Sequence, residues 1–310
     1  MRSKLLAVVA LIFLAISLQA QTPHSVEGFN KRGLQRYAEG NYDGAIADFT
    51  EAIEQSSRLG DKPSRNNLSG AAAALTVPAS NDGVRVLDPR TAIAYTNRGI
   101  TRLAKGDVDG ALLDFNQAVS ISPRLAQAYN GRGCAHRAKN DYAAARADYD
   151  RAIRLEPTNA EAYDNRANVL RDQEDLPAAL KDYDRAIELA PRNAQFYDNR
   201  GQARRVAGDL TGANADFMRA ISLNPQLARP FCGRALVLYA QREFERAIAD
   251  FDRALSLDSR LADAYAGRGL ARLQLGRQAE GDEDLRRAFA LDPDLRTALA
   301  ARVQAIKERR

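Results

Sequence analysis

Apolar and polar positions recur along most of this chain with a period of 34 residues. A period of this length is typical of stacked structural repeats, so internal repetition indicates the fold more strongly than any single motif. Six contiguous copies cover residues 92–295, and a further copy covers residues 26–59. Each copy carries an aromatic residue at the same place, namely Phe29, Tyr95, Tyr129, Tyr163, Tyr197, Phe231 and Tyr265.

Small residues also recur at fixed positions when each copy is numbered from 1 at residues 26, 92, 126, 160, 194, 228 and 262. Position 8 is Gly or Ala in every copy, and position 27 is always Ala. The spacing predicts two helices per copy, for example about residues 161–171 and 177–189, with a proline at position 32 ending most second helices. Small residues let these helices approach closely, and aromatics at positions 4 and 24 fill the gaps between them.

This pattern resembles the tetratricopeptide-repeat (TPR) family, whose 34-residue unit has aromatic, small and proline positions at these places. The resemblance implies an all-α fold, a TPR solenoid in which helix-turn-helix repeats wind into a right-handed superhelix with a concave surface. One helix pair cannot bury its apolar faces alone, so stacking is obligatory. The last copy departs most from the pattern, with Gly281 and Leu285 at positions 20 and 24, which suits a terminal repeat.

Two charged positions are constant in all seven copies: position 7 is Arg and position 23 is Asp. Repetition of both charges within one chain indicates a repeated contact. We expect a ladder of Arg–Asp pairs between first and second helices, on exposed surface where each pair adds only about 0–1 kcal/mol. The alternative is two independent rows of solvated side chains.

Three segments lie outside the repeats. Residues 1–20 have the basic start, the apolar run and the small residue at Ala20 that are typical of a signal peptide. We therefore expect an exported protein, periplasmic or secreted in a Gram-negative bacterium, or else one anchored by a retained N-terminal segment. Residues 60–91 are rich in Gly, Pro, Ser and Asn and are expected to form an insertion or linker. Residues 296–310 are expected to form a C-terminal capping helix.

The composition excludes most catalytic chemistry. Two cysteines and two histidines are too few for a disulfide scaffold or a His-rich metal centre. Neither a Gly-rich phosphate loop nor a nucleophile elbow is present, and the carboxylate pairs recur in each repeat, unlike an active site. We expect no enzyme activity, no cofactor and no metal. A net charge of +5 is spread along the chain without a basic run, which argues against a nucleic-acid partner.

The family resemblance implies a partner-binding groove lined by positions 2, 5, 9, 12 and 13 of the first helices. Arg137, Arg171 and Arg205 all occupy position 12 and are expected to form a basic row suited to a peptide with carboxylates. Tyr37 and Tyr239 also occupy position 12, and we expect them to be free of packing contacts and available for binding. The predicted groove residues are Tyr37, Asn130, Arg137, Asn168, Arg171, Gln202, Arg205 and Tyr239.

The function that these features favour is a non-enzymatic scaffold or adaptor of the cell envelope, which binds a protein or peptide in the groove. The membrane is expected as a partner only if the N-terminal segment is retained. Two alternatives remain: a membrane-anchored assembly factor, and an accessory protein of an envelope enzyme or polysaccharide system.

Overall fold

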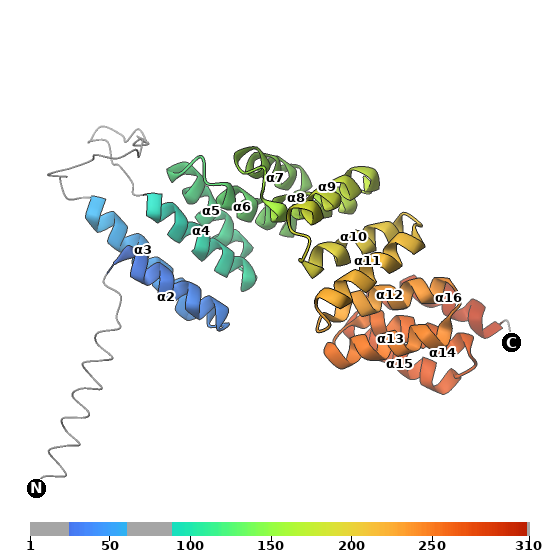
Figure 1. Cartoon of the computed structure of the whole chain (residues 1–310). Helices are drawn as coiled ribbons and strands as arrows, with labels where there is room; N and C mark the ends of the chain where they lie inside the picture. The colour runs from blue at the N-terminus through green and yellow to red at the C-terminus, as the bar shows by residue number, and fades with distance from the viewer. Residues whose placement is uncertain (1–24, 61–88, 309–310) are drawn as a thin grey trace, which may run out of the picture. The chain divides into compact units, whose positions relative to one another are not determined.

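The computed structural model describes residues 25–60 and 89–308, and within these ranges all regular secondary structure is helical (Figure 1). The predicted all-α class is therefore confirmed. The predicted signal peptide at 1–20 lies outside the described residues, as do residues 61–88 of the insertion predicted at 60–91. The remaining residues of that insertion, 60 and 89–91, belong to helices α3 and α4. No helix of the described part is long and apolar enough to cross a membrane.

The chain divides into two compact units, Met1–Pro157 and Thr158–Arg310. Helices α2 and α3, α4 and α5, and α6 and α7 form consecutive packed pairs in the described part of the first unit. Their bounds are α2 Val26–Ala38, α3 Tyr42–Gly60, α4 Pro89–Ala104, α5 Val108–Ile121, α6 Ala126–Ala138 and α7 Tyr142–Leu155.

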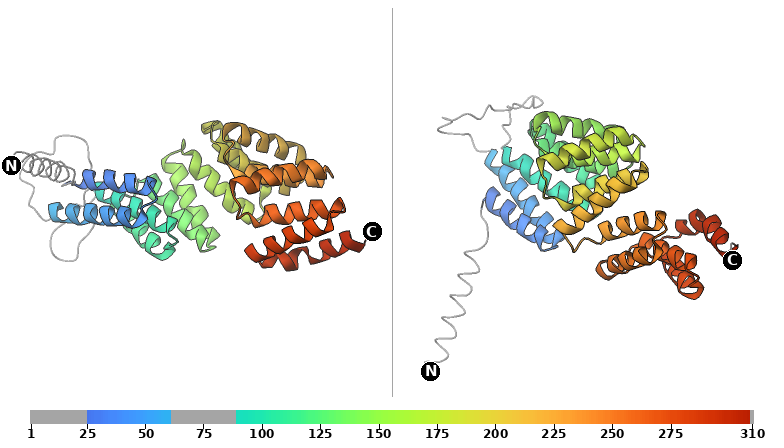
Figure 2. Two further views of the ribbon diagram at one scale, coloured as in Figure 1. Left: turned by 90° about the horizontal axis from the view of Figure 1, so that it is seen from below. Right: turned by 45° about the vertical axis from the view of Figure 1, so that its right-hand side comes forward.

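The second unit contains four further helix pairs and a single helix, α16, after the last pair. Each pair packs on the next, and Figure 2 shows this unit's orange and red helices lying beside one another. The bounds are α8 Ala160–Asp172, α9 Leu176–Leu189, α10 Ala194–Val206, α11 Leu210–Leu223, α12 Ala228–Ala240, α13 Phe244–Leu257, α14 Ala262–Gln274, α15 Gln278–Leu291 and α16 Asp294–Glu308.

The turn inside each helix pair is set by two adjacent positions. Position 15 adopts the left-handed conformation in every repeat: it is glycine in four of them, but Asn140, Glu174 and Arg242 in the others, with φ between 60° and 67°. At position 16 an Asp commonly starts the second helix, as where Asp209 accepts a hydrogen bond from the N–H of Gly212 at 2.8 Å. The cap satisfies a backbone donor that would otherwise have no partner.

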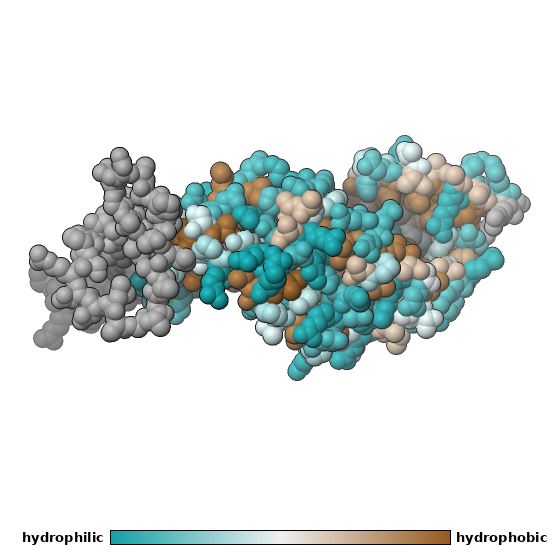
Figure 3. Space-filling view, turned by 90° about the horizontal axis from the view of Figure 1, so that it is seen from above, coloured by the Kyte–Doolittle hydropathy of each residue, from teal (hydrophilic) through white to brown (hydrophobic). Residues whose placement is uncertain are grey.

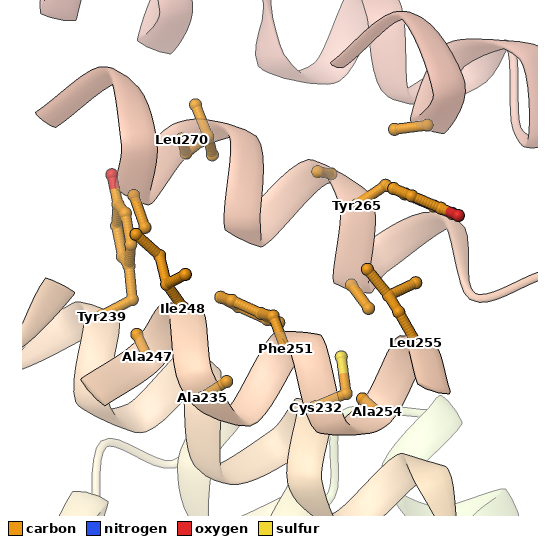
Figure 4. Close-up of a cluster of buried hydrophobic side chains, with 14 of the residues drawn as sticks. Cys232, Ala235, Tyr239, Ala247, Ile248, Phe251, Ala254, Leu255, Tyr265 and Leu270 are labelled. Carbon is orange, nitrogen blue, oxygen red and sulfur yellow. The ribbon is translucent and has the colours of Figure 1, made fainter. Parts of the chain in front are cut away.

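Close approach of the two helices depends on the small residue at position 8. The ring of Tyr149 at position 24 is fully buried, and a Cβ added to Gly133 would lie 2.6 Å from its Cε1 atom. Figure 4 shows the equivalent arrangement in the second unit, where Phe251 lies between the helices among Ala235, Ala247 and Ala254. The predicted packing of aromatic residues against small residues is therefore confirmed.

The predicted ladder of Arg–Asp pairs is confirmed in all seven repeats. In each repeat the position 7 guanidinium donates hydrogen bonds to the position 23 carboxylate of the same helix pair, and the Nη2–Oδ1 distance is 2.5 to 2.7 Å. The pairs are Arg32–Asp48, Arg98–Asp114, Arg132–Asp148, Arg166–Asp182, Arg200–Asp216, Arg234–Asp250 and Arg268–Asp284.

The expectation that these pairs are exposed is wrong. Six of the seven carboxylates belong to buried residues, and Asp284 is only 2% exposed. The aromatic ring at position 4 also lies under the arginine, as where the guanidinium carbon of Arg98 is 5.4 Å from the ring centre of Tyr95. Removal of one member of such a pair leaves a buried charge without its partner, so the pairs matter more for stability than surface ion pairs do.

Candidate partner-binding groove

The predicted groove residues fall on first helices in both units. Those on α2 and α6 belong to the first unit, whereas those on α8, α10 and α12 belong to the second. The structure therefore brings together Asn168, Arg171, Gln202, Arg205 and Tyr239 within one compact unit. The other three residues, Tyr37, Asn130 and Arg137, form a separate set.

In the first unit the first-helix face has a partly apolar surface. Asn130 and Arg137 are half-buried on α6. Leu34 at position 9 of α2 is 50% exposed, and Ile93 at position 2 of α4 is 43% exposed. The space-filling view in Figure 3 shows brown hydrophobic patches between hydrophilic ones on the surface it presents.

The two tyrosines expected to be free of packing contacts both have them. Tyr37 packs on Tyr42 with the ring centres 5.5 Å apart. Tyr239 is buried and packs on Phe244, and the guanidinium carbon of Arg302 from α16 lies 4.8 Å from its ring centre. The expectation was wrong because each tyrosine packs on the aromatic residue at position 17 of its own repeat, and Arg302 of α16 also covers Tyr239.

Asn168 is buried and its amide group is occupied inside the second unit. Its Oδ1 accepts a hydrogen bond from the hydroxyl of Tyr183 at 2.9 Å, and its Nδ2 donates to the backbone carbonyl and a carboxylate oxygen of Asp164. Asn199 of α10 also donates to both carboxylate oxygens of Asp164, at 3.0 and 2.9 Å. These bonds join α8 to α10. Asn168 and Asp164 therefore fix the relative position of two first helices and are not available to a partner.

Asp198 is a fully buried carboxylate on α10. Its Oδ2 accepts a hydrogen bond from Gln195 at 3.2 Å and lies 3.7 Å from Nε of Arg229, whereas its Oδ1 is buried without a hydrogen-bond partner. Burial raises the pKa of Asp198, and the nearby positive charges of Arg229 and Arg171 only partly oppose this shift. The side chain is therefore a buried acceptor at a position predicted to face a ligand.

The arginines of the second unit do not form a bare basic row. Arg171 donates to Asp172 at 3.1 Å, and Nε of Arg205 donates to the Oε1 of Gln202 at 3.3 Å. Arg229, at position 2 of α12, contributes a further exposed guanidinium next to Asp198. Acidic and basic groups therefore alternate along this face.

A cavity of about 120 Å³ lies between α10 and α12 on this face. Arg205, Arg229 and Gln202 supply polar groups, and Asp263 of α14 supplies a carboxylate. Cys232, Leu236 and Leu261 supply apolar surface. Sequence reasoning missed Arg229 and Asp263, although both occupy position 2, because the groove positions were followed only through the central repeats.

The cysteine in this cavity is not set up as a nucleophile. Burial raises the pKa of the Cys232 thiol to about 12, and Asp263 adds to the shift. Nucleophilic cysteines instead have a lowered pKa. In the part of the chain that the structure describes, no group of three or more His, Cys, Asp or Glu residues is arranged to hold a metal ion.

Comparison with family models identifies the repeats. Models described as tetratricopeptide repeat match residues 130–194, 165–228 and 262–295, and one described as TPR repeat matches 235–276. Together these matches cover more than half of the 310 residues. The chain belongs to the tetratricopeptide-repeat family, whose members are generally non-enzymatic interaction modules and scaffolds for protein–protein contacts.

Solved structures share the fold at low sequence identity. A tetratricopeptide repeat protein from Parabacteroides merdae superposes with a TM-score of 0.62 at 16% identity, covering 91% of this chain and 100% of its own. The APC/C hetero-tetramer Cut9-Hcn1 gives a TM-score of 0.64 at 17% identity, over 86% of this chain and 47% of that one. Pseudomonas aeruginosa pilF gives 0.57 at 20% identity, over 71% and 97%. Comparison with curated protein sequences gives no match.

Proposed function

We propose that this protein is a non-enzymatic adaptor of the cell envelope, which binds a peptide or protein segment along the first helices of its second unit. The observation that best supports the proposal is the cavity beside Arg205 and Arg229. The guanidinium groups there have hydrogen-bond donors to spare, and Leu236 and Leu261 offer apolar surface beside them. Arginine binds carboxylates through paired hydrogen bonds, so an acidic side chain of the partner fits this place.

Two carboxylates beside the arginines, the buried Asp198 and the exposed Asp263, favour an extended peptide over a simple anion. Asp198 and Asp263 lie among the arginines, and a backbone N–H or an amide of the partner would complement them. A peptide chain carries acidic side chains for the arginines and N–H donors for the two acids at short intervals, whereas a simple anion supplies acceptors only.

A selection from random peptides displayed on phage tests the binding site. Peptides selected on the wild-type chain are titrated by calorimetry against wild type and the double variant Arg205→Ala/Arg229→Ala. We expect at least about tenfold weaker binding by the variant, corresponding to roughly 1.4 kcal/mol. The control is Arg154→Ala/Arg192→Ala, which removes the same charge from exposed positions outside the cavity. Equal affinity of wild type and the Arg205/Arg229 variant contradicts the site.

The envelope location rests on residues 1–20. Cell fractionation followed by N-terminal sequencing tests it, and a mature chain that begins at Gln21 in the periplasm or the medium is expected. A chain that begins at Met1 in the membrane fraction supports the anchored alternative. A full-length chain in the cytoplasm contradicts export.

A further inference from the structure

The position 7 arginines have a second neighbour besides their Asp partners. In four of them, Nη1 donates to a polar side chain at position 25 of the preceding repeat in the same unit. This bond ties the second helix of one repeat to the first helix of the next. The pairs are Arg98 with Thr50 (2.9 Å), Arg132 with Asn116 (2.9 Å), Arg200 with Asp184 (2.7 Å) and Arg268 with Asp252 (2.5 Å).

Arg234 lacks this bond. Its Nε and Nη2 both donate to Asp250 at 2.7 Å, as in the other repeats, but position 25 of the preceding repeat is Met218. A thioether is at best a weak acceptor. Nη1 of Arg234 therefore has no partner among the described residues, although the equivalent atoms of Arg200 and Arg268 meet carboxylates.

A second residue that differs from the neighbouring repeats widens the gap beside Arg234. Position 11 is Arg204 and Arg272 in the neighbouring repeats, where each donates to the position 23 carboxylate. In this repeat position 11 is Leu238, which is buried. The Asp250 side chain is consequently 13% exposed, compared with 2% for Asp284 in the next repeat.

A cleft of about 280 Å³ lies at this gap in the ladder. Its polar lining comes from Arg234, Asp250, Asn214 and Arg246, and its apolar lining comes from Met218, Leu238 and Ala249. The Met218 side chain is 52% exposed. The cleft is bounded by α11, α12 and α13 and shares no lining residue with the cavity beside Arg205 and Arg229.

The chain itself shows which group fits beside the arginine. In the repeats on either side a carboxylate occupies the place next to Nη1, carried by Asp184 and Asp252. The charge of Arg234 is already balanced by Asp250, so a single carboxylate suits the remaining donor better than a phosphate dianion does. Arg246, whose exposed guanidinium is paired with Glu243, also lines the cleft, so the donor left for a ligand is Nη1 of Arg234.

We propose that this cleft is a second docking site, which receives an Asp or Glu side chain of a partner protein. The partner's carboxylate binds Nη1 of Arg234 in the place that Asp184 and Asp252 fill in the neighbouring repeats. An apolar side chain of the same partner packs against Met218 and Leu238. The partner's carboxylate thus supplies the hydrogen-bond acceptor that this repeat lacks.

Methyl NMR of methionine tests the proposal, because Met1 and Met218 are the only methionines in the sequence. The full chain is labelled with methyl-¹³C methionine, and the Met218 resonance is assigned by its loss in Met218→Leu. The probe is the capped dipeptide acetyl-leucyl-glutamic acid amide, and its control is the glutamine analogue. We expect a saturable shift of the Met218 methyl with the glutamate probe, in the millimolar range suited to one small contact, and none with the control.

Two variants of the protein test whether the group that binds beside the position 7 arginine must be a carboxylate. Met218→Asp supplies the missing acceptor internally, and we expect it to raise the melting temperature and to weaken calorimetric binding of the glutamate probe at least about tenfold. Asp252→Met opens the equivalent gap beside Arg268. We expect this variant to show an additional methionine methyl resonance that also responds to the glutamate probe.

Three results with the probes overturn the proposal: equal shifts with both probes, no saturable shift at millimolar probe, or undiminished binding by Met218→Asp. Binding of the Met218 region to a second copy of the chain also contradicts it, and sedimentation at increasing protein concentration detects such self-association. The result is independent of the Arg205/Arg229 site, because neither arginine is changed in these variants.

Discussion

Arg98 donates two parallel hydrogen bonds to the carboxylate of Asp114, from Nε at 2.9 Å and from Nη2 at 2.7 Å. Arg102, one helical turn further along α4, donates a third bond to the same carboxylate at 2.9 Å. The Asp114 side chain is 3% exposed. Two helices are thus joined through one buried carboxylate, and six other repeats repeat the central pair.

Replacement of this carboxylate should destabilise the protein strongly. In Asp114→Asn the two arginines lose their counter-charge in a buried setting, and we expect the free energy of unfolding to fall by about 3–5 kcal/mol. Urea denaturation followed by circular dichroism measures the change. Asp109→Asn is the control, because Asp109 pairs with Lys139 at 2.7 Å on exposed surface and should cost at most about 1 kcal/mol. Similar losses in both variants would contradict the structural role of the buried pair.

The turn residues give a reciprocal prediction. Glu174 has φ of 65°, whereas Gly208 occupies the same position of the next repeat with φ of 83°. A residue with a Cβ is strained in this conformation by about 1–2 kcal/mol. Glu174→Gly should therefore raise the free energy of unfolding by about 1 kcal/mol, and Gly208→Glu should lower it by a similar amount. Thermal unfolding measures both, and shifts of the same sign would be incompatible with strain at this position.

The two cysteines should differ in reactivity in the folded protein. Cys232 is buried with a pKa of about 12, whereas Cys134 is half-buried and lies 3.4 Å from the hydroxyl of Tyr149. Thiol reagents attack the thiolate, so at pH 8 we expect iodoacetamide to label Cys134 much faster than Cys232. Mass spectrometry of timed samples measures the two rates, and denaturant should make them equal. Equal rates without denaturant would show that the Cys232 thiol is accessible.

Asp198 should make stability depend on pH in an unusual direction for an aspartate. Its pKa is raised in the folded state above 3.8, so the charged form is disfavoured by folding. The resulting destabilisation is fully present above the raised pKa and disappears below the unfolded value. Asp198→Asn should therefore raise the melting temperature at pH 7, and its advantage over wild type should shrink as pH falls towards 4. An advantage that grows on acidification would have the wrong sign.

The fold was predictable because small and aromatic residues recur at the same positions in seven repeats. A single Gly or Ala at position 8 says little, but Gly133 and Gly201 occupy the same position of two repeats, and each has an aromatic residue 16 positions later, Tyr149 and Phe217. The Arg–Asp pairing was predictable for the same reason. The burial of those pairs was not, because the extra arginine at position 11 and the ring at position 4 act only once the helices are packed.

The candidate site was less predictable because it depends on residues that depart from the repeat pattern or lie outside it. Tyr239 occupies a groove position, yet Arg302 from outside the regular repeats packs on its ring. Met218 looks like an ordinary exposed residue until the structure shows that position 25 faces the arginine of the next repeat. A contact with the helix after the last repeat decides the first case, and a contact between neighbouring repeats decides the second. A pattern defined within one repeat contains neither.

We propose above all that a partner binds along the first helices of the second unit. Hydrogen exchange of the full chain, with and without a selected peptide, tests it most directly. We expect added protection in α10 and α12, with little change in the second helices α9 and α11. Protection confined to the second helices, or absent from the whole second unit, would contradict it.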